Sequence, residues 1–284
     1  MTTPLVEQAR AKINLTLRVL GRRADGYHEL ESLVAFADVA DRLNLRPGDT
    51  LALDVSGPFA AASGDVSDNL VLKAVAALSQ RVSGLRVGHF ELEKNIPVAA
   101  GIGGGSADAA AALRLLARAN GIAPDDARLM EAARAVGADV PVCLASKCCI
   151  MRGVGEQLSQ VDLPATTTVL VNPGVALSTR DVFAKFAGPE GGAPIGDLPR
   201  DPKAMVAFLA QHGNDLTPAA IACAPVVDEV LAELRAGPGS LLARMSGSGA
   251  TCFALFASAG EAAEAASVVK NKHKNWWVTA TTLG

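Results

Sequence analysis

An α+β fold built on antiparallel sheets is the fold class that this sequence predicts, and three observations support it. Residues 11–19 and 89–93 alternate apolar with polar side chains, which is the pattern of strands that face a core on one side. A glycine-rich turn at 101–105 runs directly into an alanine-rich helix at 107–112. The elements expected up to residue 93, which are two strands, a helix and a third strand, follow the order β-β-α-β, and this order is typical of a sheet with helices on one face.

Length and composition limit the classes of protein to consider. The chain has 284 residues, 50% of them hydrophobic, which suffices for one large or two ordinary domains. We place a domain boundary near residue 160, giving domains 1–160 and 161–284. A net charge of -3 without a basic stripe argues against nucleic acid binding. No apolar run reaches the ~20 residues that span a bilayer and no signal peptide is visible, so we expect a cytoplasmic protein. We also expect a monomer or weak homodimer.

The first strand carries polar residues at alternating positions. In residues 11–19, Lys12, Asn14 and Thr16 share one face and the other face is aliphatic, which predicts a strand with a polar working face. The other elements expected before residue 160 are a turn at 21–26, a strand at 33–45 with Asp38 and Asp41 near turns, a helix capped by Asp68 or Asn69 and ending at Ser79, a strand at 84–93, the glycine-rich turn with its helix, and a helix from 124 to about 137.

The second half of the chain alternates strands with helices. Strands are expected at 166–171, 241–245, 252–256 and 277–278, and helices at 181–186, 203–211, 219–235 and 261–270. A second glycine-rich turn, at 246–249, joins two of these strands.

The first glycine-rich turn has the features of a phosphate-binding loop. Its glycines, at 101 and 103–105, can adopt positive φ, so that successive backbone N–H groups can converge on one anion. Ser106 and Asp108 open the helix that follows, and the unpaired N–H groups and positive dipole end of this helix would face the same anion. The sequence therefore predicts a phosphate cradle.

Other interpretations of this turn are weaker. A Walker A loop requires a lysine before the serine, but Ser106 directly follows Gly105. The dinucleotide fingerprint requires a third glycine at position 106 and a buried parallel strand before the loop, whereas residues 89–93 alternate apolar with charged side chains. A glycine- and alanine-rich segment that only allows close helix packing stays possible.

Five segments together carry a resemblance to a known family. They are AKINLTL at 11–17, ADGYHEL at 24–30, PVAAGIGGGSADAA at 97–110, GADVPVCL at 137–144 and MSGSGATCF at 245–253. The chain resembles the GHMP kinases over nearly its whole length. The resemblance implies a two-domain fold, with a ribosomal-protein-S5-like ATP-binding domain followed by a ferredoxin-like α/β-plait domain. It also implies that ATP and Mg²⁺ are used to phosphorylate a hydroxyl group, and the DGYHE and GADVP segments favour a cytidyl diphosphate sugar alcohol of isoprenoid precursor synthesis as the small-molecule substrate.

The same resemblance implies roles for individual residues in phosphoryl transfer. The ATP loop would comprise Pro97, Val98, Ala99, Ala100, Gly101, Ile102, Gly103, Gly104, Gly105, Ser106 and Ala107. Ser106 is the candidate contact for Mg²⁺ or a phosphate oxygen, which is compatible with capping the helix, and Asn69 matches a position near the adenine. Asp139 and Lys12 match the catalytic pair. The aspartate would accept or orient the proton of the attacking hydroxyl, and the lysine would hold that carboxylate ionised and offset phosphoryl charge.

Substrate recognition is expected from a third set of residues. These are Asn14, Tyr27, His28, Thr179, Phe183, Gly247, Ser248 and Gly249. Tyr27 is the only tyrosine of the chain, and an aromatic face beside an imidazole suits stacking and edge recognition of a pyrimidine. The family places the cytosine there, with Phe183 on its other face, and brings the second glycine-rich turn toward the substrate phosphates.

Simpler structural roles and other functions stay open at this point. Asp139 could only cap the short segment that contains Pro141, and Lys12 could belong to a solvated strand face. A GHMP kinase for homoserine or mevalonate would keep the ATP loop but give no reason for Tyr27 and His28. A nicotinamide-dependent oxidoreductase or a nucleotide-binding module without chemistry are the alternatives from other classes.

Overall fold

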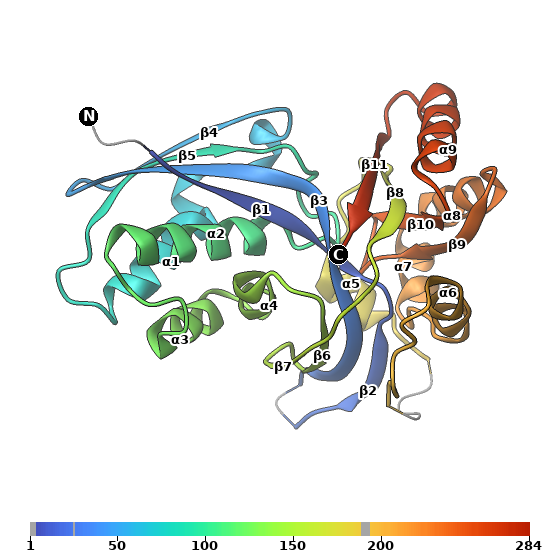
Figure 1. Ribbon diagram of the computed structural model, residues 1–284, viewed down its shortest axis with the longest axis horizontal. Coiled ribbons are helices and arrows are strands. Elements are labelled where there is room, and N and C mark those ends of the chain that lie inside the picture. Colours follow the sequence, from blue (N-terminus) through green and yellow to red (C-terminus); the bar gives the residue numbers. More distant parts are fainter. Residues whose placement is uncertain (1–3, 25, 189–193) are drawn as a thin grey trace. The chain divides into compact units, whose positions relative to one another are not determined.

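The computed structural model describes residues 4–24, 26–188 and 194–284, which form two compact units (Figure 1). Of the described residues, unit 1 contains 4–11, 39–98 and 103–146, and unit 2 contains 12–24, 26–38, 99–102, 147–188 and 194–284. The units are interleaved along the chain because strand β3 (His28–Gly48) and the glycine-rich turn each contribute residues to both. The single boundary expected near residue 160 stays a prediction.

Unit 1 packs helices against one side of a sheet, as expected from the β-β-α-β order (Figure 1). Its elements are β4 (Ala52–Ser56), β5 (Val87–Glu93), α1 (Leu70–Ser79), α2 (Gly104–Ala119), α3 (Ala127–Val136), α4 (Val140–Ala145) and the short 3-10 helices η1 (Ala60–Ser63) and η2 (Val66–Asp68). β5 lies between β3, to which it is antiparallel, and β4, to which it is parallel. Phe90 and Leu92 of β5 are fully buried while His89 and Glu91 are half-buried, which confirms the alternation seen in the sequence.

Unit 2 contains an antiparallel sheet with the strand order β11-β8-β10-β9. Its elements are β2 (Arg18–Arg22), β6 (Cys149–Gly153), β7 (Gln157–Gln160), β8 (Thr166–Asn172), β9 (Ser240–Met245), β10 (Cys252–Phe256), β11 (Trp277–Leu283), α5 (Thr179–Ala184), α6 (Pro202–Gln211), α7 (Thr217–Cys223), α8 (Val226–Ala236) and α9 (Ala259–Lys272). Helices α8 and α9 pack against this sheet. The core between them is aliphatic and includes Val169, Val171, Leu231 and Val269.

The strand expected at 11–19 is interrupted. β1 (Leu5–Asn14) ends before residue 15 and β2 begins at Arg18. Leu15 donates its backbone N–H to the carbonyl of Leu33, and Leu17 forms an isolated parallel bridge with Asn214. β1 and β2 both pair with β3, but between them Leu17 bridges Asn214 instead, which divides one alternating pattern between two strands.

Two further expectations about local structure were wrong. The helix expected at 219–235 is two helices, α7 and α8, because Pro225 lies at the N-cap of the second one and cannot continue the first. β3 is one continuous strand from His28 to Gly48, so that Asp41 lies within a strand and is fully buried, far from any turn.

Candidate active site

The two glycine-rich turns contact each other through their backbones within unit 2. Gly101 has φ +74°, and a Cβ atom there would lie 2.5 Å from the carbonyl oxygen of Gly249. Thr251 donates its backbone N–H to the carbonyl of Ala100 at 3.1 Å, and the hydroxyl of Ser246 donates to the carbonyl of Gly101 at 3.2 Å. Only glycine fits at position 101, because backbone atoms occupy the space that a side chain would need.

The second glycine-rich turn is held by a buried asparagine that the sequence analysis missed. Asn214 donates from Nδ2 to the carbonyls of Met245 and Gly247, both at 2.8 Å, and its Oδ1 accepts the backbone N–H of Leu216 at 3.0 Å. Gly247 has φ +56°, and a Cβ atom there would lie 2.7 Å from the carbonyl oxygen of Gly101. No motif around position 214 signals this role, because the two carbonyls to which Asn214 donates lie about thirty residues later in the chain.

Lys12 and Asn14 lie beside these turns and are buried, at 4% and 1% exposure. Lys12 donates its backbone N–H to the carbonyl of Ile102 at 2.9 Å. Asn14 donates its backbone N–H to the hydroxyl of Ser246 at 3.1 Å and its Nδ2 to the hydroxyl of Ser32 at 2.7 Å. The Oδ1 atom of Asn14 is buried and has no hydrogen-bond partner among the described residues. The polar residues expected on one face of this strand therefore lie beside the two turns, but they are buried and do not face solvent.

Two of the residues expected around the pyrimidine, His28 and Phe183, are in contact within unit 2. The rings of His28 and Phe183 are stacked, with centroids 4.9 Å apart and planes inclined by 23°. Phe186 meets His28 edge-on at 6.3 Å. Tyr27 is 65% exposed at the end of the turn that precedes β3. In this structure the imidazole of His28 thus occupies one face of the Phe183 ring.

Two further residues expected near the substrate also meet. Thr179 is the first residue of α5, whose N-terminus is capped by the hydroxyl of Ser178. The hydroxyl oxygen of Thr179 lies 2.8 Å from that of Ser248, in the second glycine-rich turn. The hydroxyl groups of residues 69 positions apart in the sequence thus form one polar group.

In unit 1, the helix after the first glycine-rich turn begins earlier than expected. Gly103, with φ +64°, is the N-cap of α2 and accepts the backbone N–H of Ala107 at 2.8 Å. Ser106 is the third residue of the helix, so it is not the capping residue. Gly103 has no side chain with which to cap α2, so the first N–H groups of this 16-residue helix can bind an anion, which the positive end of the helix dipole would also favour.

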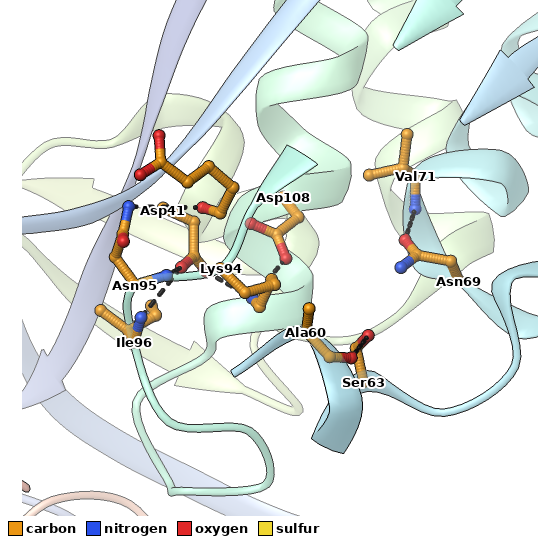
Figure 2. Close-up of polar contacts among 10 residues, drawn as sticks. Asp41, Ala60, Ser63, Asn69, Val71, Lys94, Asn95, Ile96 and Asp108 are labelled. Atoms are coloured by element: carbon orange, nitrogen blue, oxygen red, sulfur yellow. Dashed lines mark hydrogen bonds and ion pairs between the residues drawn. The ribbon is translucent and has the colours of Figure 1, made fainter. Parts of the chain in front are cut away.

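Asn69 and Asp139 occupy N-cap positions of unit 1 helices, with different roles for their side chains. The Oδ1 atom of Asn69 accepts the backbone N–H of Val71 at 2.9 Å and caps α1, which confirms the expected cap (Figure 2). Asp139 precedes α4, but its side chain makes no capping hydrogen bond. The alternative interpretation, in which the side chain of Asp139 only caps the segment that contains Pro141, is therefore not supported by the structure.

The potential metal ligands near the start of α2 fit a magnesium ion that is bound mainly by the phosphates of a nucleotide. Among residues 4–24, 26–188 and 194–284, no group of three or more His, Cys, Asp or Glu side chains could hold a metal ion. Mg²⁺ commonly uses one or two protein ligands and completes its shell with substrate phosphates and water. The hydroxyl of Ser106, in the first turn of α2, would suit such a site.

Comparison with known proteins assigns the family. Residues 69–147 match the family described as GHMP kinases N terminal domain, and residues 200–275 match GHMP kinases C terminal. The chain is 55% identical, over all of its length and 99% of the relative, to a 4-diphosphocytidyl-2-C-methyl-D-erythritol kinase of Rhodopseudomonas palustris. A protein of the same name from Nitrobacter hamburgensis is also 55% identical, over 99% of this chain and 96% of the relative. The chain belongs to the GHMP kinases.

Solved structures confirm the two-domain fold of this GHMP kinase. A crystal structure of 4-(cytidine 5'-diphospho)-2C-methyl-D-erythritol kinase matches with a TM-score of 0.80 and 33% identity, covering 99% of each chain. A homoserine kinase from Cytophaga hutchinsonii shares the fold with a TM-score of 0.71 at 19% identity, covering 100% of this chain and 95% of that one. The GHMP fold excludes the nicotinamide-dependent oxidoreductase that the glycine-rich turn alone left open.

Two other expectations about this GHMP kinase concern membrane spans and the oligomeric state. Within the described ranges, none of the helices combines the length and apolar character needed to cross a membrane. The oligomeric state expected from the sequence, a monomer or weak homodimer, stays a prediction.

Proposed function

We propose that this GHMP kinase transfers the γ-phosphoryl group of ATP to the 2-hydroxyl of 4-diphosphocytidyl-2-C-methyl-D-erythritol, in the methylerythritol phosphate pathway of isoprenoid precursor synthesis. The observation that carries the proposal is the identity of 53–57%, over nearly the full length of both chains, to relatives that share this enzyme's name. The stacking of His28 on Phe183 adds support, because an imidazole beside an aromatic face suits recognition of a nucleobase, although Phe183 also packs against the core of unit 2.

The nucleotide would bind at residues 97–107 and near Asn69. The backbone N–H groups at the start of α2 would take the phosphates, with the helix dipole favouring their negative charge. Ser106 would hold Mg²⁺ together with phosphate oxygens, and this ion neutralises charge on the transferred group when it is bound. Phosphoryl transfer depends mostly on positioning and charge stabilisation, which a backbone cradle supplies without a reactive side chain.

The proposed catalytic residues are Asp139 and Lys12. Asp139 would accept or orient the proton of the attacking hydroxyl, a role that needs a carboxylate whose oxygens are not engaged in capping a helix. Lys12 is buried, so its positive charge acts through a medium of lower dielectric than water and offsets developing negative charge more strongly than a surface lysine could.

The cytidyl end of the substrate would bind around Tyr27, His28 and Phe183. A pyrimidine between Tyr27 and Phe183 would replace the imidazole on the face of Phe183, and His28 would then hydrogen-bond to the edge of the base. Asn14 Oδ1, a buried acceptor without a partner among the described residues, is available to a substrate hydroxyl. Thr179 and the turn at 247–249 would contact the diphosphate.

An ADP-release assay across candidate alcohols tests this proposal. Purified protein is given Mg²⁺ and ATP with the cytidyl diphosphate alcohol, homoserine or mevalonate, and Asp139→Asn serves as the control for contaminating kinases. Release of ADP that depends on the cytidyl compound and disappears in the variant is the expected result. Equal or greater turnover of homoserine or mevalonate would overturn the substrate assignment.

A further inference from the structure

A buried group of three charges lies in unit 1, outside the residues assigned above (Figure 2). Lys94, directly after β5, donates from Nζ to Oδ2 of Asp108 at 2.7 Å and also to Oδ2 of Asp41. All three side chains are at most 4% exposed. Burial disfavours the ammonium, but the carboxylates of Asp108 and Asp41 outweigh it and raise the pKa of Lys94, so this side chain stays charged.

Asp41 connects this group to the chain just before the phosphate loop. Its Oδ1 accepts the backbone N–H of Ile96 at 2.9 Å and also that of Asn95. Pro97, the first residue of the loop, follows directly. Asp41 thus uses one oxygen for Lys94 and the other for the two peptide groups that lead into the loop, as Figure 2 shows.

Asp108 connects the same group to the chain just after the loop. It is the fifth residue of α2, the helix whose first N–H groups form the proposed cradle. Gly104 also lies close by, since a Cβ atom there would be 3.2 Å from Cδ1 of Ile96 and 3.7 Å from Nζ of Lys94. The segment just before the loop and the helix just after it are therefore both linked to the ammonium group of Lys94.

Stability alone is a weak reason for such an arrangement. A buried ion pair is often no more stabilising than well-packed apolar residues, because desolvation of the charges offsets their attraction. Here two carboxylates share one cation, and Oδ1 of Asp108 has no hydrogen-bond partner among the described residues. Directional hydrogen bonds to a charged group do, however, fix the separation of the segments that they join more tightly than apolar contacts can.

We propose that Asp41, Lys94 and Asp108 are positioning residues that set the distance between the entry and the exit of the phosphate loop, and thereby the affinity for Mg·ATP. The inference rests on the proposed function only in placing the nucleotide at residues 97–107. On this proposal the three residues affect the nucleotide indirectly. They act through Ile96 and through the first turn of α2.

The test compares Asp108→Ala, Asp108→Asn and Glu7→Gln in the full-length protein. Glu7 is the matched control because it pairs with Arg114, farther along α2, at 3.0 Å. Calorimetry gives the Kd for Mg·ADP, steady-state assays give KM for each substrate and kcat, and thermal unfolding gives stability. Loss of a hydrogen bond to a charged group should raise the Kd of Asp108→Ala for Mg·ADP roughly tenfold or more. KM for the alcohol should change less than about twofold.

The conservative variant separates positioning from stability. The amide oxygen of Asp108→Asn can still accept the hydrogen bond from Lys94, so its Kd for Mg·ADP should return to within about threefold of wild type. Glu7→Gln should lower the unfolding temperature without changing that Kd. A Kd for Asp108→Ala equal to that of wild type would overturn the proposal, and so would an Asp108→Asn variant that binds Mg·ADP as weakly as Asp108→Ala.

Two further outcomes are distinguishable. If Asp108→Ala does not fold, Asp108→Glu displaces the carboxylate by one methylene group and should raise the Kd several-fold, and an unchanged Kd would then refute the positioning role. If wild type binds Mg·ADP but does not phosphorylate the cytidyl alcohol, the proposed function fails, whereas the inference is still decided by the Kd values.

Discussion

Replacing Gly101 by alanine would place a methyl group 2.5 Å from the carbonyl oxygen of Gly249. Restoring a C···O separation of about 3.3 Å requires the two turns to open by about 0.8 Å. The bonds from Thr251 N and Ser246 Oγ, now 3.1 and 3.2 Å long, would then exceed hydrogen-bonding range. Each lost bond costs roughly 0.5–1.5 kcal/mol and alanine at positive φ about 1–2 kcal/mol. We therefore expect a loss of about 2–5 kcal/mol in the free energy of unfolding.

Thermal and urea unfolding measure this loss, with Gly174→Ala as the matched control. Gly174 is also in unit 2 and has a similar φ of +77°, but a Cβ atom there would meet nothing closer than 3.8 Å. The control should lose only the backbone part, about 1–2 kcal/mol, and the Tm of Gly101→Ala should lie roughly 3–8 °C below that of wild type. Equal losses for the two variants would refute the argument that backbone contact between the turns excludes a side chain.

Three further predictions concern the site and the thiols. Asp139→Asn should lower kcat on the order of 10²-fold while the Kd for Mg·ADP stays unchanged, and normal turnover would rule out a role on the hydroxyl. Phe183→Ala should raise KM for the cytidyl alcohol by an amount equivalent to roughly 1–3 kcal/mol of stacking, and a rise confined to KM for ATP would place this ring in the other pocket. Burial raises the pKa of the Cys149 thiol to about 11, so that at pH 8 iodoacetamide should label half-exposed Cys223 first. Peptide mass spectrometry should show that labelling of Cys149 accelerates about tenfold for each pH unit as the pH rises toward this pKa. Equal labelling rates of the two cysteines at pH 8 would contradict a raised pKa at Cys149.

Local patterns in the sequence predicted the elements whose cause is local. The alternation at 89–93 corresponds to β5, and the side chain of Asn69 caps α1 as expected, because both depend on neighbours a few residues away. The break at Pro225 is also a local signal, since proline cannot donate the hydrogen bond that a continuous helix requires, and the single helix expected there neglected it.

Long-range contacts explain what the sequence could not predict. Asn14 is buried because its partners include Ser246, which lies 232 residues later. Lys94 pairs with Asp41, 53 residues earlier in a strand, and no spacing rule connects two such positions. The residues of the candidate site could be proposed from motifs, whereas the side chains that hold them in place, such as Asn214, have no motif of their own.

The contact between the two glycine-rich turns also bears on the order of events during synthesis of the chain. Ala100 and Gly101 receive their hydrogen bonds from Thr251 and Ser246, about 145 residues later. While the chain grows on the ribosome, helix α2 can form and Lys12 can already bind the carbonyl of Ile102, but the carbonyls of Ala100 and Gly101 have no donors until β9 and the turn that follows it have emerged. A fragment that ends near residue 160 would therefore contain the complete ATP-loop sequence and still lack these two hydrogen bonds, so we expect nucleotide binding to be among the last properties that the newly made protein acquires.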